Sequence, residues 1–162
     1  MKKKRVICVR TCLIKEGSVL YESKKGKRTI TSPEEAAVFA ASFFEDSDKE
    51  MIYVCTLNGR NEPVAMEMVA KGGGNWCRAD ISQIYKTAII SNGTGIICFH
   101  NHPSGDPEPS KEDKLFTEKM KIAGKYLDIP LCDHIILGEN GAFYSFGENK
   151  MEQETEDFQE KK

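Results

Sequence analysis

The stretch that decides the fold runs from residue 96 to residue 113 and reads IICFHNHPSGDPEPSKED. Its first residues are apolar and rich in β-branched and aromatic side chains, which predicts a short buried strand over Ile96–Phe99. Three prolines and a glycine within residues 100–109 predict irregular structure there. Ser110 then predicts the start of a helix that runs to about Asp128. The stretch therefore predicts a strand, a rigid loop and a helix.

The segments on either side predict further strands and helices that alternate along the chain. Upstream, the patterns predict a hairpin over about residues 6–22, a helix from Ser32 to about Phe44, strands over Met51–Leu57 and Pro63–Ala70, and a helix that follows Asp80. Downstream, they predict a closing hairpin over Leu131–Leu137 and Phe143–Phe146 and a disordered charged tail over 148–162. Interleaved strands and helices are typical of an α/β or α+β fold. We therefore expect one domain over residues 1–147 with a mixed β-sheet flanked by helices.

The composition is that of a single globular domain. Hydrophobic residues make up 40% and charged residues 30% of the 162 residues. The chain has no apolar run of the roughly 20 residues that span a bilayer. Arg10 and Lys15 interrupt the first apolar segment, which argues against a signal peptide, so we expect a cytoplasmic protein.

Cysteine usage and charge narrow the class of protein further. The six cysteines include no C-x-x-C pair, and we expect them to be reduced. The net charge of -2 disfavours a dedicated duplex-DNA binder, because such proteins usually carry a basic face.

Two of the three histidines, His100 and His102, directly follow the predicted strand. Alternate residues of an extended chain project to the same side, so both imidazoles can face one point. The loop then leads to a helix start that carries Asp113. Two imidazoles and one carboxylate form a three-ligand site that leaves the fourth position of a zinc ion for water, as in catalytic zinc sites. Imidazole ligands favour zinc over magnesium or calcium, so we expect one zinc ion per chain.

Each of these features also has a simpler interpretation. A His-x-His pair often occurs by chance, and Ser110-x-x-Asp113 is a common capping pattern in which the serine side chain accepts a hydrogen bond from the backbone. Capping by Ser110 is compatible with a hydroxyl that faces the site. The combination of both patterns on a strand, a loop and a helix start favours the metal site.

The complete pattern resembles a known family. His100-x-His102, seven residues and Ser110-x-x-Asp113 match the JAMM signature H-x-H-x7-S-x2-D of JAB/MPN metallopeptidases. The string HNHPSGDPEPS and the later DHIILG at residues 133–138 resemble the RadC-like branch of that family.

The resemblance covers about residues 30–147 and implies a cytidine-deaminase-like mixed sheet with flanking helices. Full-length RadC proteins usually carry an N-terminal helix-hairpin-helix region, which is a DNA-binding element. The sequence shows no such region, so we expect nucleic-acid binding to be weak at most.

The resemblance also implies a catalytic glutamate on a strand upstream of the histidines. The matching stretch is AMEMV at residues 65–69, which assigns this role to Glu67. The residue types agree, because a buried acid in an otherwise apolar strand needs a compensating partner. A solvent-facing position on an edge strand is the alternative for Glu67. Glu62 is the competing acid, and we expect it to be exposed in the preceding turn.

The family implies zinc-dependent hydrolysis, in which water attacks an amide carbonyl. In this scheme Glu67 is the general base, and the Ser110 hydroxyl donates a hydrogen bond to the developing oxyanion. The implied substrate is a peptide or isopeptide of unknown identity. Two alternatives stay open: a DNA-associated RadC-like protein in DNA repair or mobile-element biology, and a non-catalytic interaction module. The deaminase motifs H-x-E and P-C-x-x-C are missing from the sequence, which excludes a base deaminase.

Other residues near the motif have weaker interpretations. We expect Asp133 and His134 to lie behind the ligands or in the core. Cys98 could project toward the metal but is more typical of a core residue, as is Cys77. The run of glycines at residues 72–74 fits no phosphate-binding motif and predicts a flexible rim of the cleft.

Overall fold

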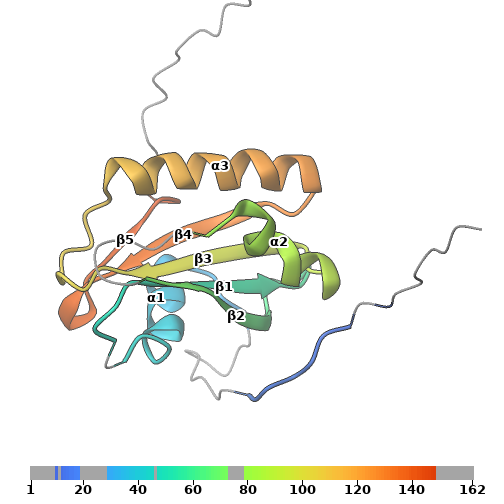
Figure 1. The fold of residues 1–162 in the computed structure, drawn as a ribbon, viewed down its shortest axis with the longest axis horizontal. Coiled ribbons are helices and arrows are strands. Elements are labelled where there is room, and N and C mark those ends of the chain that lie inside the picture. Colours follow the sequence, from blue (N-terminus) through green and yellow to red (C-terminus); the bar gives the residue numbers. More distant parts are fainter. Residues whose placement is uncertain (1–9, 11, 19–28, 46, 73–78, 149–162) are drawn as a thin grey trace, which may run out of the picture.

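The computed structural model describes residues 10, 12–18, 29–45, 47–72 and 79–148. Its elements, in chain order, are α1 (Pro33–Ala41), β1 (Met51–Leu57), β2 (Pro63–Lys71), α2 (Ile81–Ile90), β3 (Gly95–Asn101), α3 (Lys111–Leu127), β4 (Leu131–Leu137), the short 3-10 helix η2 (Glu139–Gly141) and β5 (Phe143–Ser145). Figure 1 shows their arrangement.

The strands of the described residues form one five-stranded sheet in the order β2-β1-β3-β4-β5. β3 and β4 pair in parallel, whereas the other neighbours pair antiparallel. Parallel neighbours need a crossover connection, and α3 provides it between β3 and β4. The mixed sheet with its helices confirms the fold class predicted from the sequence.

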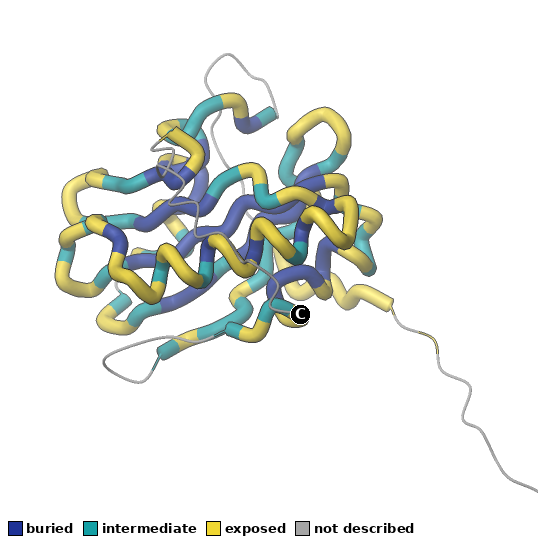
Figure 2. Tube along the Cα trace, turned by 90° about the horizontal axis from the view of Figure 1, so that it is seen from above, coloured by how far each residue is buried: buried dark blue, intermediate teal, exposed yellow. Residues whose placement is uncertain are grey.

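Helices cover both faces of this sheet (Figure 1). α1 packs on one face, in an apolar cluster that includes Ile97 and Phe99 of β3. α2 and α3 pack on the other face, in a cluster that includes Ile96 and Cys98 of β3. Successive strand residues point to opposite faces, so β3 lies between two cores and is buried along its whole length. Figure 2 shows the central strands as a buried band behind α3, whose outer face is exposed.

The helices begin where the sequence predicts them. Ser32 caps α1 by accepting a hydrogen bond from the backbone at 3.3 Å, and Ser110 caps α3. Asp80 occupies the cap position of α2, but its side chain makes no capping hydrogen bond within the described part of the chain. The first helix ends earlier than predicted, at Ala41 rather than near Phe44.

β3 is longer than the sequence predicts. The prolines predict irregular structure from residue 100 onward, but the strand continues through His100 to Asn101. This prediction is wrong by two residues because both are tied to β1. His100 pairs with Ile52, and the Asn101 side chain accepts a hydrogen bond from the Met51 backbone at 2.8 Å. The strand therefore holds His100 more firmly than a loop would.

The N-terminal hairpin predicted over about 6–22 lies mostly outside the described residues. Its described positions, Arg10 and residues 12–18, form no strand. The tail predicted to be disordered over 148–162 also lies outside the described residues, apart from Glu148.

The described cysteines form no disulfide with one another: Cys12, Cys55, Cys98 and Cys132. Cys8 and Cys77 lie outside the described residues. Among the helices of the described residues, none combines the length and the apolar character needed to cross a membrane.

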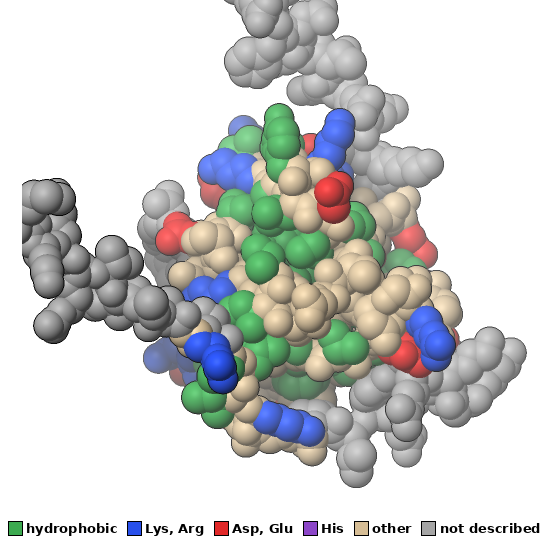
Figure 3. All heavy atoms as spheres, turned by 90° about the vertical axis from the view of Figure 1, so that its right-hand side faces the viewer, with side chains coloured by type: hydrophobic (Ala, Val, Ile, Leu, Met, Phe, Trp, Pro, Cys, Tyr) green, Lys and Arg blue, Asp and Glu red, His purple; other side chains and the backbone are tan. Residues whose placement is uncertain are grey.

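The two ends of the molecule differ in character. Figure 3 shows the end at which α3 ends and β3 begins, where hydrophobic side chains gather between scattered charged ones. No histidine of the described residues is visible on that face. His100, near the end of β3, and Asp113, in the first turn of α3, lie at the other end, where β3 ends and α3 begins (Figure 1).

Gly124 lets α3 approach its neighbours closely. A Cβ atom at this position would lie 2.6 Å from the Tyr85 hydroxyl and 2.7 Å from the Ile129 carbonyl oxygen. Backbone atoms cannot rotate away as a flexible side chain can, so the helix itself would have to shift.

We predict that Gly124→Ala lowers the free energy of unfolding by about 1–3 kcal/mol through overpacking. Helix propensity alone would raise it by roughly 1 kcal/mol, so the sign of the change separates the two effects. Urea unfolding followed by circular dichroism measures the change. Lys125→Ala, at an exposed position of the same helix, serves as the control and should change stability little. A Gly124→Ala protein that is more stable than the wild type would contradict this packing.

Candidate metal centre

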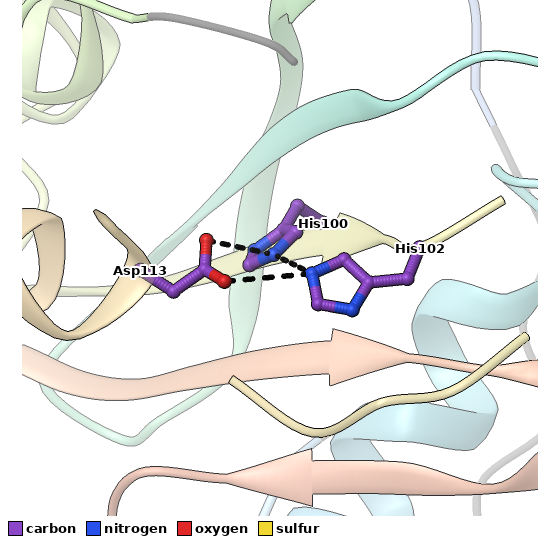
Figure 4. Close-up of side chains that lie close together, drawn as sticks. All are labelled: His100, His102 and Asp113. Carbon is purple, nitrogen blue, oxygen red and sulfur yellow. Dashed lines mark hydrogen bonds and ion pairs between the residues drawn. The ribbon is translucent and has the colours of Figure 1, made fainter. Parts of the chain in front are cut away.

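The carboxyl end of β3 and the first turn of α3 bring three side chains together. His100 lies in β3, His102 directly follows the strand, and Asp113 lies in the first turn of α3. One ligand atom of each residue lies within 4.8 Å of the others. Figure 4 shows the Asp113 carboxylate facing both imidazoles. The three residues that the sequence predicts as metal ligands therefore form one cluster that could hold a metal ion.

The two Nε2 atoms and the two carboxylate oxygens of Asp113 are spaced much as ligand atoms around one ion are. The Nε2 atoms of His100 and His102 are 3.0 Å apart. Asp113 Oδ1 lies 3.3 Å from His100 Nε2, and Asp113 Oδ2 lies 3.5 Å from His102 Nε2. Zinc bonds of about 2.0–2.1 Å at tetrahedral angles place neighbouring ligand atoms about 3.3 Å apart. A single ion can consequently reach all three residues.

A chain of hydrogen bonds behind His100 determines which of its ring nitrogens carries the proton. The Thr117 hydroxyl donates to the Asp113 backbone carbonyl at 2.7 Å, so it can only accept from His134 Nδ1, which is also 2.7 Å away. Burial lowers the pKa of His134 well below its usual value, so this ring is neutral. Its Nε2 therefore accepts a hydrogen bond of 2.8 Å from His100 Nδ1. In the neutral ring, the lone pair of His100 is therefore on Nε2, the atom that faces the ligand cluster.

The loop after β3 orients the second histidine. Nδ1 of His102 lies 2.8 Å from the Asp106 carbonyl oxygen, which can only accept, so this nitrogen carries a hydrogen and Nε2 faces Asp113. The hydrogen bond with Asp113 raises the pKa of His102 and outweighs burial, which lowers it. A proton and a metal ion would compete for the same Nε2 lone pair.

Ser110 holds the carboxylate of Asp113 in place. The Ser110 backbone N–H and hydroxyl donate to Asp113 Oδ2 at 2.8 and 2.6 Å, and the hydroxyl accepts from the Asp113 N–H at 3.1 Å. This reciprocal arrangement is a capping box. Two donors occupy Oδ2, which makes Oδ1 the oxygen best placed to bind an ion.

The Asp113 carboxylate stays ionised. Burial raises the pKa of Asp113, but its contacts with His100, His102 and Ser110, which favour the ionised form, outweigh burial and hold the pKa far below its usual value. Two imidazole nitrogens that offer lone pairs and one carboxylate anion match the ligand preference of zinc.

The neighbouring thiol does not belong to the cluster. Cys98 is fully buried in the core between the sheet and the pair α2 and α3. Burial raises the pKa of its thiol, so Cys98 lacks the thiolate form that binds metals. Its interpretation as a core residue agrees with this position.

Glu67 lies in β2, on the sheet face that carries His100. It pairs with Val54 of β1, and Val54 pairs with Cys98 of β3, two residues before His100. Two strand spacings of about 4.8 Å place the backbones of Glu67 and Cys98 about 10 Å apart. Oε2 of Glu67 accepts a hydrogen bond from the Thr87 hydroxyl of α2, and Glu67 is not part of the ligand cluster. Its role as a base stays a prediction.

Glu62 lies at the other end of the sheet. It follows β1 in the turn after Leu57, and Leu57 pairs with Gly95 at the start of β3, whereas His100 is near the end of that strand. The Glu62 carboxylate accepts a hydrogen bond from Asn58 Nδ2 at 2.7 Å, and the residue is half-buried. The expectation that Glu62 is exposed is therefore wrong, and its position removes it as a competing base.

His134 and Asp133 lie outside the ligand cluster. His134 contacts His100 from β4, whereas the Asp133 carboxylate accepts hydrogen bonds from the Ser145 hydroxyl at 2.7 Å and the Gly147 N–H at 2.8 Å. Asp133 therefore joins β4 to the end of β5. Of the three glycines that were expected to form a rim, Gly72 is described, and residues 73 and 74 lie outside the described residues.

A mixed sheet whose central strand and crossover helix carry a His-x-His and a Ser-x-x-Asp arrangement defines a domain of the JAB/MPN class. Residues 30–151 match the family model of the RadC-like JAB domain. The chain belongs to the RadC-like JAB domain family.

Curated relatives agree with this family. The chain is 36% identical over 132 residues to a UPF0758 protein of Pelodictyon phaeoclathratiforme, which covers 82% of this chain and 59% of the relative. It is 30% identical over 145 residues to a UPF0758 protein of Pasteurella multocida, at 90% and 64% coverage. A UPF0758 protein of Clostridium beijerinckii is 40% identical over 111 residues, at 68% and 48% coverage. The chain therefore spans between 48% and 64% of the length of these relatives, whose names assign no activity.

We predict that Thr117→Val lowers zinc affinity about 10-fold to 100-fold, because loss of the hydroxyl leaves His134 without the acceptor that fixes the tautomer of His100. Competition with a chromophoric chelator measures the affinity. Thr87→Val is the matched control, because it removes a buried hydroxyl that contacts Glu67 rather than a ligand histidine. Equal zinc affinities of the wild type and Thr117→Val would contradict the proposed hydrogen-bond chain.

Proposed function

We propose that this domain is a zinc-dependent hydrolase that cleaves amide bonds in peptides or isopeptides. The observation that carries the proposal is the convergence of the Nε2 atoms of two histidines and the Asp113 carboxylate, with one ligand atom of each residue within 4.8 Å of the others. Three protein ligands are typical of catalytic zinc sites, whereas structural sites use four. Resemblance to the JAMM metallopeptidases supports the choice of amide bonds.

A zinc ion held by these residues would polarise the amide carbonyl and lower the pKa of a water molecule. The Thr87 hydroxyl donates to Glu67 Oε2 and thereby orients the carboxylate. We assign the second oxygen, Oε1, to proton transfer: it accepts the proton of the attacking water and later delivers it to the leaving nitrogen. Glu67 shares the sheet face of His100, which supports this role.

The structure suggests a second role for Ser110. Its hydroxyl has one hydrogen, which goes to Asp113 Oδ2, and its backbone N–H donates to the same oxygen. We propose that Ser110 mainly positions the carboxylate of Asp113. Donation to an oxyanion, as the resemblance implies, would require this hydroxyl to turn away from Asp113.

We predict about one zinc ion per chain in protein purified without added metal, because the cluster offers one set of three ligands. Elemental analysis of the wild type and of His102→Ala measures the content, and His102→Ala should lose the zinc together with activity. A wild type without stoichiometric transition metal, and with no uptake of added zinc, would contradict the proposal.

We predict that Glu67→Gln keeps its zinc and its stability but loses about 10²-fold to 10⁴-fold in turnover, since glutamine preserves the size of the side chain but cannot accept a proton. Cleavage of internally quenched peptide libraries, with zinc content and thermal unfolding measured in parallel, tests this.

Near wild-type turnover by Glu67→Gln, on a substrate that the chelated protein cannot cleave, would exclude Glu67 as the base. Glu50 would then be the next residue to test, because its charge acts on His102 and helps to raise the pKa of that ring. Zinc binding without cleavage of any amide would instead favour a non-catalytic module.

A further inference from the structure

A groove of about 700 Å³ lies beside the metal cluster, between α1 and the segment that joins β4 to β5. Ligand sites typically have volumes of about 300–1,000 Å³. One wall is the face of α1 formed by Glu34, Ala37, Val38 and Ala41, whose spacing places them on the same side of the helix. The opposite wall is η2 with the adjoining ends of β4 and β5. The small alanine side chains of α1 leave room between the walls.

His102 belongs both to this groove and to the metal cluster. The residue lines the groove, while its Nε2 atom faces Asp113. Its side chain is 18% exposed, whereas that of His100 is 2% exposed, so the groove reaches the cluster from the His102 side. In Figure 4, α1 lies on the His102 side of the three residues. A molecule bound in the groove would therefore lie beside His102.

The lining of the groove combines apolar surface with negative charge. Val38 is 70% exposed there, and Phe44, Leu137 and Phe143 supply further apolar surface. Three carboxylates come from the segment after α1 and from η2: Glu45, Asp48 and Glu139. Among the described residues that line the groove, there is no Lys or Arg. Apolar walls strengthen the field of like charges in a cleft, so the groove attracts cations.

We propose that this groove binds a peptide segment that carries a Lys or Arg side chain next to an apolar side chain, and that it presents the neighbouring amide bond at His102. The carboxylates account for the basic side chain, and the exposed Val38 with the aromatic surface accounts for the apolar one. Cleavage of this segment rests on the proposed hydrolase function, whereas its binding does not.

Binding is tested separately from cleavage. The probe is a series of fluorescein-labelled Ala-Gly peptides that contain one Leu and, beside it, a single Lys, Ser or Glu. Fluorescence anisotropy with zinc-loaded Glu67→Gln protein measures binding without turnover. We expect the Lys peptides to bind about tenfold more tightly than the Glu peptides at low salt, with a difference that shrinks as salt is added.

Charge reversal in the groove identifies where the peptide binds. Glu45→Lys and Glu139→Lys, on different sides of the groove, should each weaken binding of the Lys peptides about tenfold and strengthen binding of the Glu peptides. Glu118→Lys is the control, since Glu118 is exposed on α3 away from the groove and forms an ion pair with the surface residue Lys121 at 2.9 Å. This control should leave both affinities nearly unchanged.

A steric variant separates occupancy of the groove from long-range attraction. Ala41→Trp fills the groove and should abolish binding of every peptide in the series. Ser42→Trp, at the next exposed position and outside the groove lining, should not.

The outcomes distinguish this inference from the proposed function. Preferred binding of Lys peptides that Glu45→Lys reverses would support the groove even if no peptide is cleaved. The wild type could instead cleave peptides with no preference for a basic residue, at a rate unchanged in Glu45→Lys and Ala41→Trp. That result would contradict the proposed role of the groove and leave the proposed hydrolase function intact.

Discussion

Parallel pairing of β3 with β4 forces the chain to return along the sheet through α3, and the site depends on this crossover. A crossover helix begins near the carboxyl end of the strand that it follows. Asp113, in the first turn of α3, therefore lies beside His100 and His102 at the end of β3. The same parallel register places Cys98 opposite His134, so that His134 reaches the ring of His100 from the neighbouring strand. This one connection thus supplies Asp113 to the candidate metal cluster and leads to the strand whose His134 contacts His100.

Burial makes this arrangement specific. His100, His134 and Thr117 are buried. A polar atom of these side chains without a hydrogen-bond partner would therefore destabilise the folded state. The contacts between them meet that requirement and place a proton on His100 Nδ1, so that in the neutral ring the lone pair faces the cluster. A fully satisfied buried network of this kind also restricts motion of the side chains. The positions of the ligand atoms are consequently set before any ion binds.

The two faces of the sheet contribute differently to the proposed function. The face under α2 and α3 carries His100 and, in β2, Glu67. The face under α1 opens at its edge into the acidic, partly apolar groove that ends at His102. His102 follows the last residue of β3 and so lies between the two faces of the sheet. In this arrangement the proposed chemistry and the proposed binding of a peptide occupy opposite sides of one strand end.

Local patterns were sufficient for much of the fold. The order of strands and helices, the caps at Ser32 and Ser110 and the β1 boundaries follow from periodicity and capping preferences, which act between residues a few positions apart. The spacing of His100, His102, Ser110 and Asp113 predicted which residues form the cluster that could hold a metal ion for the same reason, since a strand, a short loop and a helix start leave little freedom. The end of β3 was misjudged because its last two residues are held by β1, far away in the sequence.

The sequence by itself determined which residues form the ligand cluster and the family to which the domain belongs. Only the tertiary structure decided how protons are placed on the histidines, because Thr117, His134 and His100 come from three separate elements. It also decided the position of Glu67 against Thr87, the removal of Glu62 from the site, and the groove between α1 and η2. These features depend on contacts between residues that are distant along the chain, and such contacts exist only once the sheet has formed and the helices have packed on it.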